Sequence, residues 1–217
     1  MLKNKRFKNY TSMVYEHLRN NKKEYIIVST IFLIGVFLGV IFINNSNEEQ
    51  LSKITSYFNA FLANLKSNKI DILKLTKTNV IDNIIFGVIL WFFGTTVIGI
   101  PIVFGLVLYR GFCFGYTIST IIMTIGIQKG ILFAFIALCL QNIFFIPAII
   151  AISVSGYKLY KSIIKNKDRE NIKLEILRHT LFSTIMIVIL TISAIIETMI
   201  STNFLIIFNN KIWQNKL

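Results

Sequence analysis

The longest apolar stretch of the chain is 84–157, and only Arg110 and Lys129 are charged within it. A helix on a soluble domain shows a polar face at every turn and a half-buried strand alternates, so neither accounts for this pattern. One helical crossing of a hydrocarbon core about 30 Å thick needs roughly 20 apolar residues. The stretch therefore predicts three membrane spans. Because each charge stands beside a glycine, we expect the spans to be separated there and to cover 84–108, 112–125 with its flanks, and 131–157.

Two further apolar segments, 25–43 and the one that begins near Leu181, are also long enough to cross a membrane. The first ends in IFINNSNEE, which lacks the small-x-small pattern of a signal-peptide cleavage site, so we predict a retained anchor. Gly35 and Gly39 form a GxxxG motif in this span, and such a surface lets another helix approach closely. The motif fits either a contact within the bundle or a contact with a partner.

Segment 44–83 is predicted to be a sizeable loop that contains an amphipathic helix, because its apolar residues recur at helical spacing. One interpretation is a helix that lies at the membrane interface or folds onto the bundle. The other is a docking surface for an extracytoplasmic protein, and amphipathicity alone does not distinguish lipid from protein. The apolar face consists of Leu51, Ile54, Phe58, Phe61, Leu62 and Leu65, and the other face carries Lys53, Asn59, Asn64 and Lys66.

The pattern as a whole predicts an all-α, polytopic membrane bundle of about five transmembrane helices. Most of the 23 Lys and Arg residues fall in segments on the side of the N-terminus, and positive charge concentrates in the cytoplasm. We therefore expect a cytoplasmic N-terminus and an extracytoplasmic C-terminus. The expected parts are a basic cytoplasmic segment 1–24, helix 25–43, an extracytoplasmic loop 44–83, the three-span block 84–157, a basic cytoplasmic loop 158–179, the last span with an outer interfacial segment 180–208, and a tail 209–217.

Composition and charge add one point to this picture, which is the kind of partner that the chain contacts. The 217 residues are 54% hydrophobic and carry a net charge of +13, which leaves no room for a separate catalytic domain. The positive residues lie in short segments between apolar runs, so they predict contact with anionic lipid headgroups on the cytoplasmic side and not with nucleic acid. Cys113 and Cys139 fall inside predicted spans without a CxxC partner or a nearby His, which argues against a disulfide or a metal site. Homo-oligomerisation stays open.

The sequence contains none of the arrangements that carry enzymatic chemistry. It has no HExxH, no GxSxG and no Gly-rich phosphate loop between a strand and a helix. His17 and His179 stand alone in basic segments and are expected to be solvated surface residues. We therefore predict a protein that is not an enzyme and that needs no cofactor or metal.

Polar and helix-breaking residues inside the spans are the remaining candidates. Prolines remove a backbone donor and are expected to kink their helices, and intramembrane polar groups need partners, so they mark either helix packing or a site. Glu197 is predicted to lie close to the outer boundary of the last span. The residues singled out as helix-packing or partner sites are Gly99, Pro101, Arg110, Gly111, Gly115, Gln141, Asn142, Pro147 and Glu197.

Several of these residues occur in an order that resembles the stage II sporulation protein M family. The resemblance extends from the first anchor to the last span and includes the length and the five-span layout. The chain departs from the family at Leu140, where a proline is common. The matching pieces are Val97-Ile98-Gly99-Ile100-Pro101, Gly111-Phe112 through Gly115-Tyr116-Thr117, Gln141-Asn142 with Ile146-Pro147-Ala148, and Ile196-Glu197.

The resemblance implies a role in endospore formation, at the membrane of the mother cell that engulfs the forespore. It implies stage II sporulation proteins D and P, which degrade peptidoglycan, as partners, and a scaffold that localises them at the septal membrane. A different class also fits the residues. A transporter or channel subunit is the alternative, because helices broken at Pro101 and Pro147, together with Gln141, Asn142 and Glu197, are features of substrate sites in transporters.

Overall fold

The computed structural model describes residues 18–67, 72–135, 140–165 and 169–214, and these residues form an all-helical protein. Five of its helices are long and apolar enough to cross a membrane, which confirms the predicted fold class. Each of these five contains an 18-residue window of high mean hydropathy with at most two charged residues, which is close to the length that a bilayer requires. The helices are α2 (Lys22–Asn44), α3 (Glu48–Ser67), α4 (Ile72–Gly94), α5 (Gly99–Ile125), α6 (Ile127–Ala134), α7 (Leu140–Lys165) and α8 (Arg169–Gln214).

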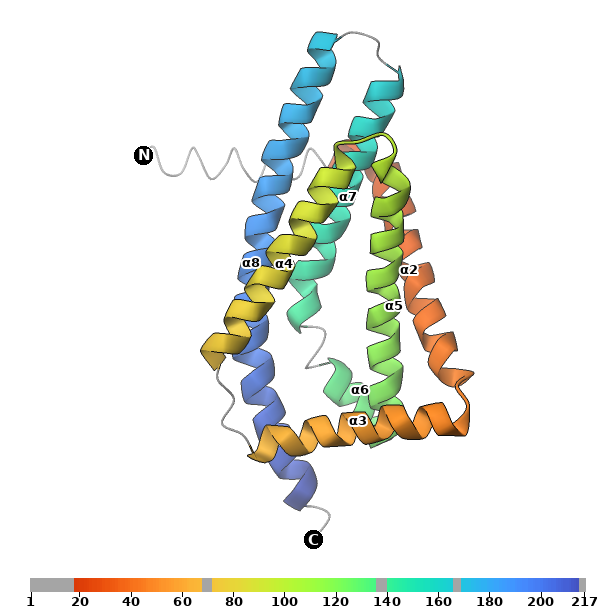
Figure 1. The fold of residues 1–217 in the computed structure, drawn as a ribbon, viewed down its shortest axis with the longest axis vertical. Coiled ribbons are helices and arrows are strands. Elements are labelled where there is room, and N and C mark those ends of the chain that lie inside the picture. The colour runs from red at the N-terminus through yellow and green to blue at the C-terminus, as the bar shows by residue number, and fades with distance from the viewer. Residues whose placement is uncertain (1–17, 68–71, 136–139, 166–168, 215–217) are drawn as a thin grey trace.

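The long helices stand side by side, and α3 lies across one end of them (Figure 1). We call this end, which also holds α6, the α3 end. The opposite end holds the start of α2, the turn between α4 and α5, and the last residues of α7. From that turn, α4 and α5 diverge toward the α3 end (Figure 1). The predicted amphipathic helix therefore exists and lies roughly across the spanning helices.

The α4–α5 turn shows that one predicted boundary is wrong. Arg110 and Gly111 do not separate two spans, because α5 continues through both of them to Ile125. The break lies earlier, where the Thr95 hydroxyl donates to the carbonyl of Phe92 at 2.6 Å and the Gly99 amide donates to the carbonyl of Thr96 at 3.2 Å. The Thr96 hydroxyl likewise donates to the carbonyl of Phe93 at 3.1 Å. Side-chain bonds of this kind offer the backbone an alternative to the helix, so α4 ends at two threonines and not at a charge.

The predicted loop 44–83 is likewise shorter than expected, because α4 already begins at Ile72. Asn79 and Asn83 therefore lie on a helix and reach α8. The Asn83 amide donates to the carbonyl of Leu190 at 3.1 Å, and the Asn79 amide donates to the Thr198 hydroxyl at 3.2 Å. Amides that looked like loop residues in the sequence thus join two antiparallel helices.

The apolar core lies where α2, α4, α5, α7 and α8 meet, and α7 is the most buried of the five. Val103 and Val107 of α5 pack with Ile149 and Ile152 of α7, and all four side chains are fully buried. Because lipid tails are as apolar as these side chains, close packing and hydrogen bonds hold such helices together and the hydrophobic effect contributes little. The positions of small residues and polar groups are therefore the informative ones.

The closest helix contact is between α2 and α5. A Cβ atom on Gly35 or Gly39 would overlap the carbonyl oxygens of Leu108 and Phe112, and one on Gly111 or Gly115 would overlap those of Phe32 and Val36. Higher numbers on α2 meet higher numbers on α5, so the two helices run in the same direction. The first GxxxG motif is therefore used within the bundle, against a second GxxxG on α5.

Candidate functional site

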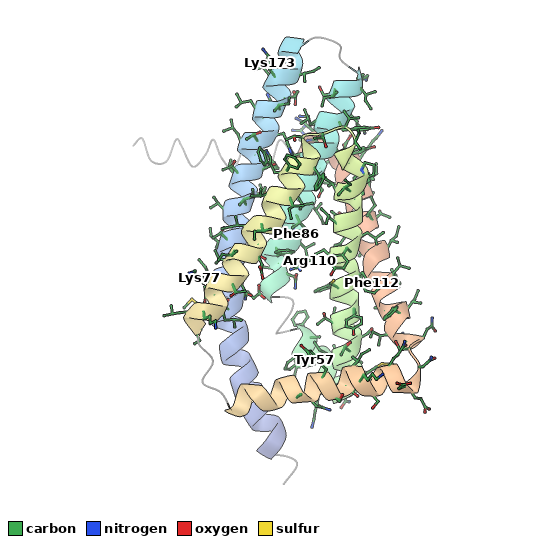
Figure 2. The ribbon with its side chains drawn as sticks, in the orientation of Figure 1. Tyr57, Lys77, Phe86, Arg110, Phe112 and Lys173 are labelled. Carbon is green, nitrogen blue, oxygen red and sulfur yellow. The ribbon has the colours of Figure 1, made fainter. Side chains whose placement is uncertain are left out.

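Arg110 lies about 17 Å along α5 from its first residue, at 1.5 Å per residue. Its guanidinium carbon is 4.4 Å from the centre of the Phe145 ring on α7 and 5.7 Å from that of Phe86 on α4. The two rings are stacked, with centres 6.1 Å apart. Figure 2 shows Arg110 projecting from α5 toward the side of α4 that carries Phe86. A half-buried cation thus lies between three spanning helices. The sequence pattern predicts Arg110 at the boundary of a span, but it lies in the middle of one.

The surroundings of Arg110 make it the strongest candidate for a functional residue. The ion pairs among the described residues involve other side chains, and the guanidinium of Arg110 lies against the faces of the two rings. Cation–π contacts contribute up to about 2 kcal/mol when water is excluded. The cost of placing an arginine at the centre of a membrane helix is roughly 3 kcal/mol or more. Arg110 therefore does not serve stability alone.

Gly99 and Pro101 lie in the first turn of α5, and the predicted kink at Pro101 is wrong. The backbone N–H groups of a first helical turn have no partner within the helix, so a proline there removes no hydrogen bond. Gly99 is buried, and a Cβ atom on it would overlap the carbonyl oxygen of Phe93. These two residues shape the α4–α5 turn, and the transporter hypothesis loses one of its two broken helices.

Gln141, Asn142 and Pro147 belong to α7, close to its first residue, Leu140. The side chain of Gln141 lies outside the described residues, and Asn142 is half-buried with a polar partner. Pro147 stands inside the helix, where its ring removes one backbone bond. Its exposed side chain lines an apolar groove beside α2 and α8. The structure thus places the Gln141-Asn142 pair one to two turns before this proline on the same helix.

Glu197 lies on α8, in the half nearer the α3 end. It is half-buried and has an interaction partner. Its neighbour Thr198 is fully buried and accepts the bond from Asn79. The candidate span on α8 is Ile172–Met199, so this carboxylate lies near one end of the span, and the helix itself continues to Gln214. The acid is therefore within a long continuous helix, beside a contact between α4 and α8.

The expectation that His179 is a solvated surface residue is wrong, because only 2% of it is exposed. Its Nδ1 lies 2.9 Å from the Ser155 hydroxyl and 3.5 Å from that of Ser183. Its ring also fills the place where α4 and α7 come closest, since a Cβ atom on Gly94 would lie 3.1 Å from Nε2. The basic segment looked solvent-exposed in the sequence, but His179 is on the inner face of α8.

Replacing His179 with Leu is expected to lower the free energy of unfolding by about 1–3 kcal/mol, because Ser155 and Ser183 lose a buried hydrogen-bond partner. Thermal unfolding of the purified protein in lipid nanodiscs measures the change. Thr184→Leu is the matched control, since that hydroxyl is exposed and bonds only to its own helix. Equal melting of the two variants would show that the histidine contacts contribute nothing.

The outward face of α3 is the second candidate surface. Leu51 and Ile54 on its apolar face are half-buried, whereas Lys53, Ser56 and Ala60 on the other face are exposed. Lys53 forms an exposed ion pair with Glu49 at 2.7 Å. The helix contacts α5 and α8, so its position relative to the bundle is fixed while its polar face is open.

Clusters of metal-ligating side chains are absent from residues 18–67, 72–135, 140–165 and 169–214. No group of three or more His, Cys, Asp or Glu side chains in these ranges could hold a metal ion. Cys113 is a free, half-buried thiol in α5, and Cys139 and His17 lie outside the described residues.

A small helical bundle with five candidate membrane spans, an arginine inside one of them and an amphipathic helix across one end defines an integral membrane protein. Comparison with protein families then identifies the chain. The family model for stage II sporulation protein M matches residues 28–202. The chain belongs to the stage II sporulation protein M family and is thus a sporulation membrane protein. No curated protein and no solved structure matches it.

Proposed function

We propose that this protein is a non-enzymatic scaffold in the mother-cell membrane that localises peptidoglycan-degrading enzymes at the septum during engulfment of the forespore. The partners are stage II sporulation proteins D and P. Family membership supports the sporulation role, and the described residues provide contact surfaces that fit a scaffold. The observation that carries the proposal is the position of α3 across one end of the bundle (Figure 1), where the side chains of its polar face are exposed.

The distribution of charge supports an extracytoplasmic position for α3. Lys158, Lys161 and Lys165 lie near the end of α7, away from α3. The opposite end also holds Lys22 and Lys23 at the start of α2. Positive residues near span ends favour the cytoplasm. The α3 end then faces the cell wall, which is where enzymes that degrade peptidoglycan act.

Two arginines on the outward face of α3, Ser56→Arg with Ala60→Arg, are expected to reduce co-purification of both enzymes roughly tenfold or more, which corresponds to about 1.4 kcal/mol. The added bulk and charge oppose a partner that fits the native face. The measurement is the amount of each enzyme recovered with the scaffold from sporulating cells in mild detergent.

Leu174→Arg is the matched control, because this exposed position lies on α8 near the opposite end. A cysteine placed at Asn59 in a cysteine-free background must also react with an impermeant reagent from outside the cell. Unchanged recovery of both enzymes with the α3 variant would refute docking at this face. Lack of labelling at position 59 would refute the orientation.

A further inference from the structure

An apolar groove of about 400 Å³ runs between α2, α7 and α8, on the part of the bundle nearer the end opposite α3. Its walls are almost entirely apolar, and small residues leave the space free. Large apolar side chains on its rim are exposed, including Ile143 and Phe144 of α7. The residues that shape it are Tyr25 and Ser29 of α2, Pro147 and Ala151 of α7, and Phe182 and Met186 of α8.

The end of the groove nearer Tyr25 carries lysines that form no ion pair among residues 18–67, 72–135, 140–165 and 169–214. Lys22 precedes Tyr25 by about one helical turn, and Lys158 follows Ala151 by about two turns on the same face of α7. Neither lysine is part of the ion pairs among the described residues. An apolar groove with cations at its membrane-surface end matches the two parts of a phospholipid.

Among the side chains that the structure describes at this end, the carboxylates of Glu24 and Glu175 are already paired. Glu24 of α2 accepts a charge-assisted hydrogen bond from Lys161 of α7 at 2.9 Å, and Glu175 accepts one from Arg178 at 2.7 Å. These pairs remove the carboxylates that could otherwise repel an anionic headgroup. The first pair also joins α2 to α7, so the two walls of the groove are held together at this end.

We propose that this groove binds one acyl chain of an anionic phospholipid, with the headgroup phosphate at Lys22 and Lys158. The apolar walls suit an acyl chain, and the two lysines at the membrane-surface end suit the phosphate of an anionic headgroup. The proposal is independent of the scaffold function, since the groove lies away from α3.

The test is native mass spectrometry of the full chain, delipidated in mild detergent and then given phosphatidylglycerol or phosphatidylcholine with identical acyl chains. Phosphatidylglycerol is expected to bind at least tenfold more tightly. The double variant Lys22→Gln with Lys158→Gln is expected to weaken phosphatidylglycerol about 30-fold, because each lysine near the surface contributes about 1 kcal/mol. Binding of phosphatidylcholine is expected to stay unchanged.

Ser29→Phe tests the apolar part, because the ring would fill the groove and weaken both lipids. Thr30→Phe is its control, since the neighbouring Thr30 is exposed and does not line the groove. Lys77→Gln with Lys129→Gln removes the same charge from exposed positions on α4 and α6. Equal binding of the two lipids, equal loss with this control pair, displacement of the lipid by free glycerol phosphate, or a second copy that covers the groove would each overturn the proposal.

Discussion

Replacing Gly115 with Leu is expected to force α2 away from α5 and to lower the free energy of unfolding by about 3 kcal/mol. A Cβ atom at this position overlaps the carbonyl oxygen of Val36. A backbone carbonyl inside a helix cannot turn aside as a flexible side chain can, so the whole helix must move. Overpacking of a tight contact costs about 1–3 kcal/mol, and we expect the upper end of that range because the obstacle is backbone. Thermal unfolding in nanodiscs gives the measurement.

Gly105→Leu provides a control on the same helix, because a Cβ atom there meets nothing within 4 Å. Both substitutions replace a glycine with leucine, but the new side chain at position 105 points into free space. The prediction is that Gly105→Leu melts as the native protein does, while Gly111→Leu melts early like Gly115→Leu. If the variants at 105 and 115 melted alike, the contact between the two GxxxG motifs would not determine stability.

The GxxxG motif on α2 illustrates how far sequence reasoning reaches. The spacing of Gly35 and Gly39 predicts a close helix contact, because small residues allow it whatever the partner is. The identity of the partner depends on which helix runs beside α2 at the same depth. That in turn depends on the turn after Gly94, whereas the position of the charges predicts a break at Arg110. Local chemistry was therefore predictable, and the pairing was not.

Burial of polar residues escaped prediction for the same reason. His179 follows a run of basic residues, and Asn83 precedes the longest apolar stretch, so both looked like boundary residues. Each is buried because its helix begins well before it, at Arg169 for α8 and at Ile72 for α4. The earlier start places each residue within a packed helix, and contacts with the other helices determine which face points inward. The sequence signal that could have predicted the burial of His179 and Asn83 was their helical spacing from apolar residues on the inner face of the same helix.

The five spans and the amphipathic α3 were predictable because each depends on a period or a length within one segment. Hydropathy over about 20 residues identifies a span regardless of its neighbours. The two-faced pattern of α3 likewise follows from the spacing of Leu51, Ile54 and the residues after them. What that helix lies against is a property of the whole bundle, and the structure alone gives its contacts with α5 and α8.

Replacing Arg110 with Leu is expected to stabilise the bundle while reducing sporulation. The change removes a charge from the middle of α5, and such a charge costs roughly 3 kcal/mol at the centre of a membrane helix. The lost cation–π contacts are worth less, about 2 kcal/mol at most. The net gain is then about 1 kcal/mol, measured as thermal unfolding in nanodiscs. Counts of heat-resistant spores from cells that carry the variant give the second measurement.

Two further variants separate charge from shape at this position. Lys keeps the charge but loses the planar group that stacks on Phe86 and Phe145, so Arg110→Lys is expected to retain part of the spore count if charge is what matters. Tyr109→Leu changes the exposed neighbour and is expected to leave both measurements unchanged.

A lower melting temperature for Arg110→Leu would mean that the ring contacts hold α4, α5 and α7 together. A higher one with normal spore counts would mean that the charge has no role in the cell. A higher melting temperature together with fewer spores would mean that Arg110 takes part in an interaction outside the folded bundle, because the bundle itself is more stable without this charge.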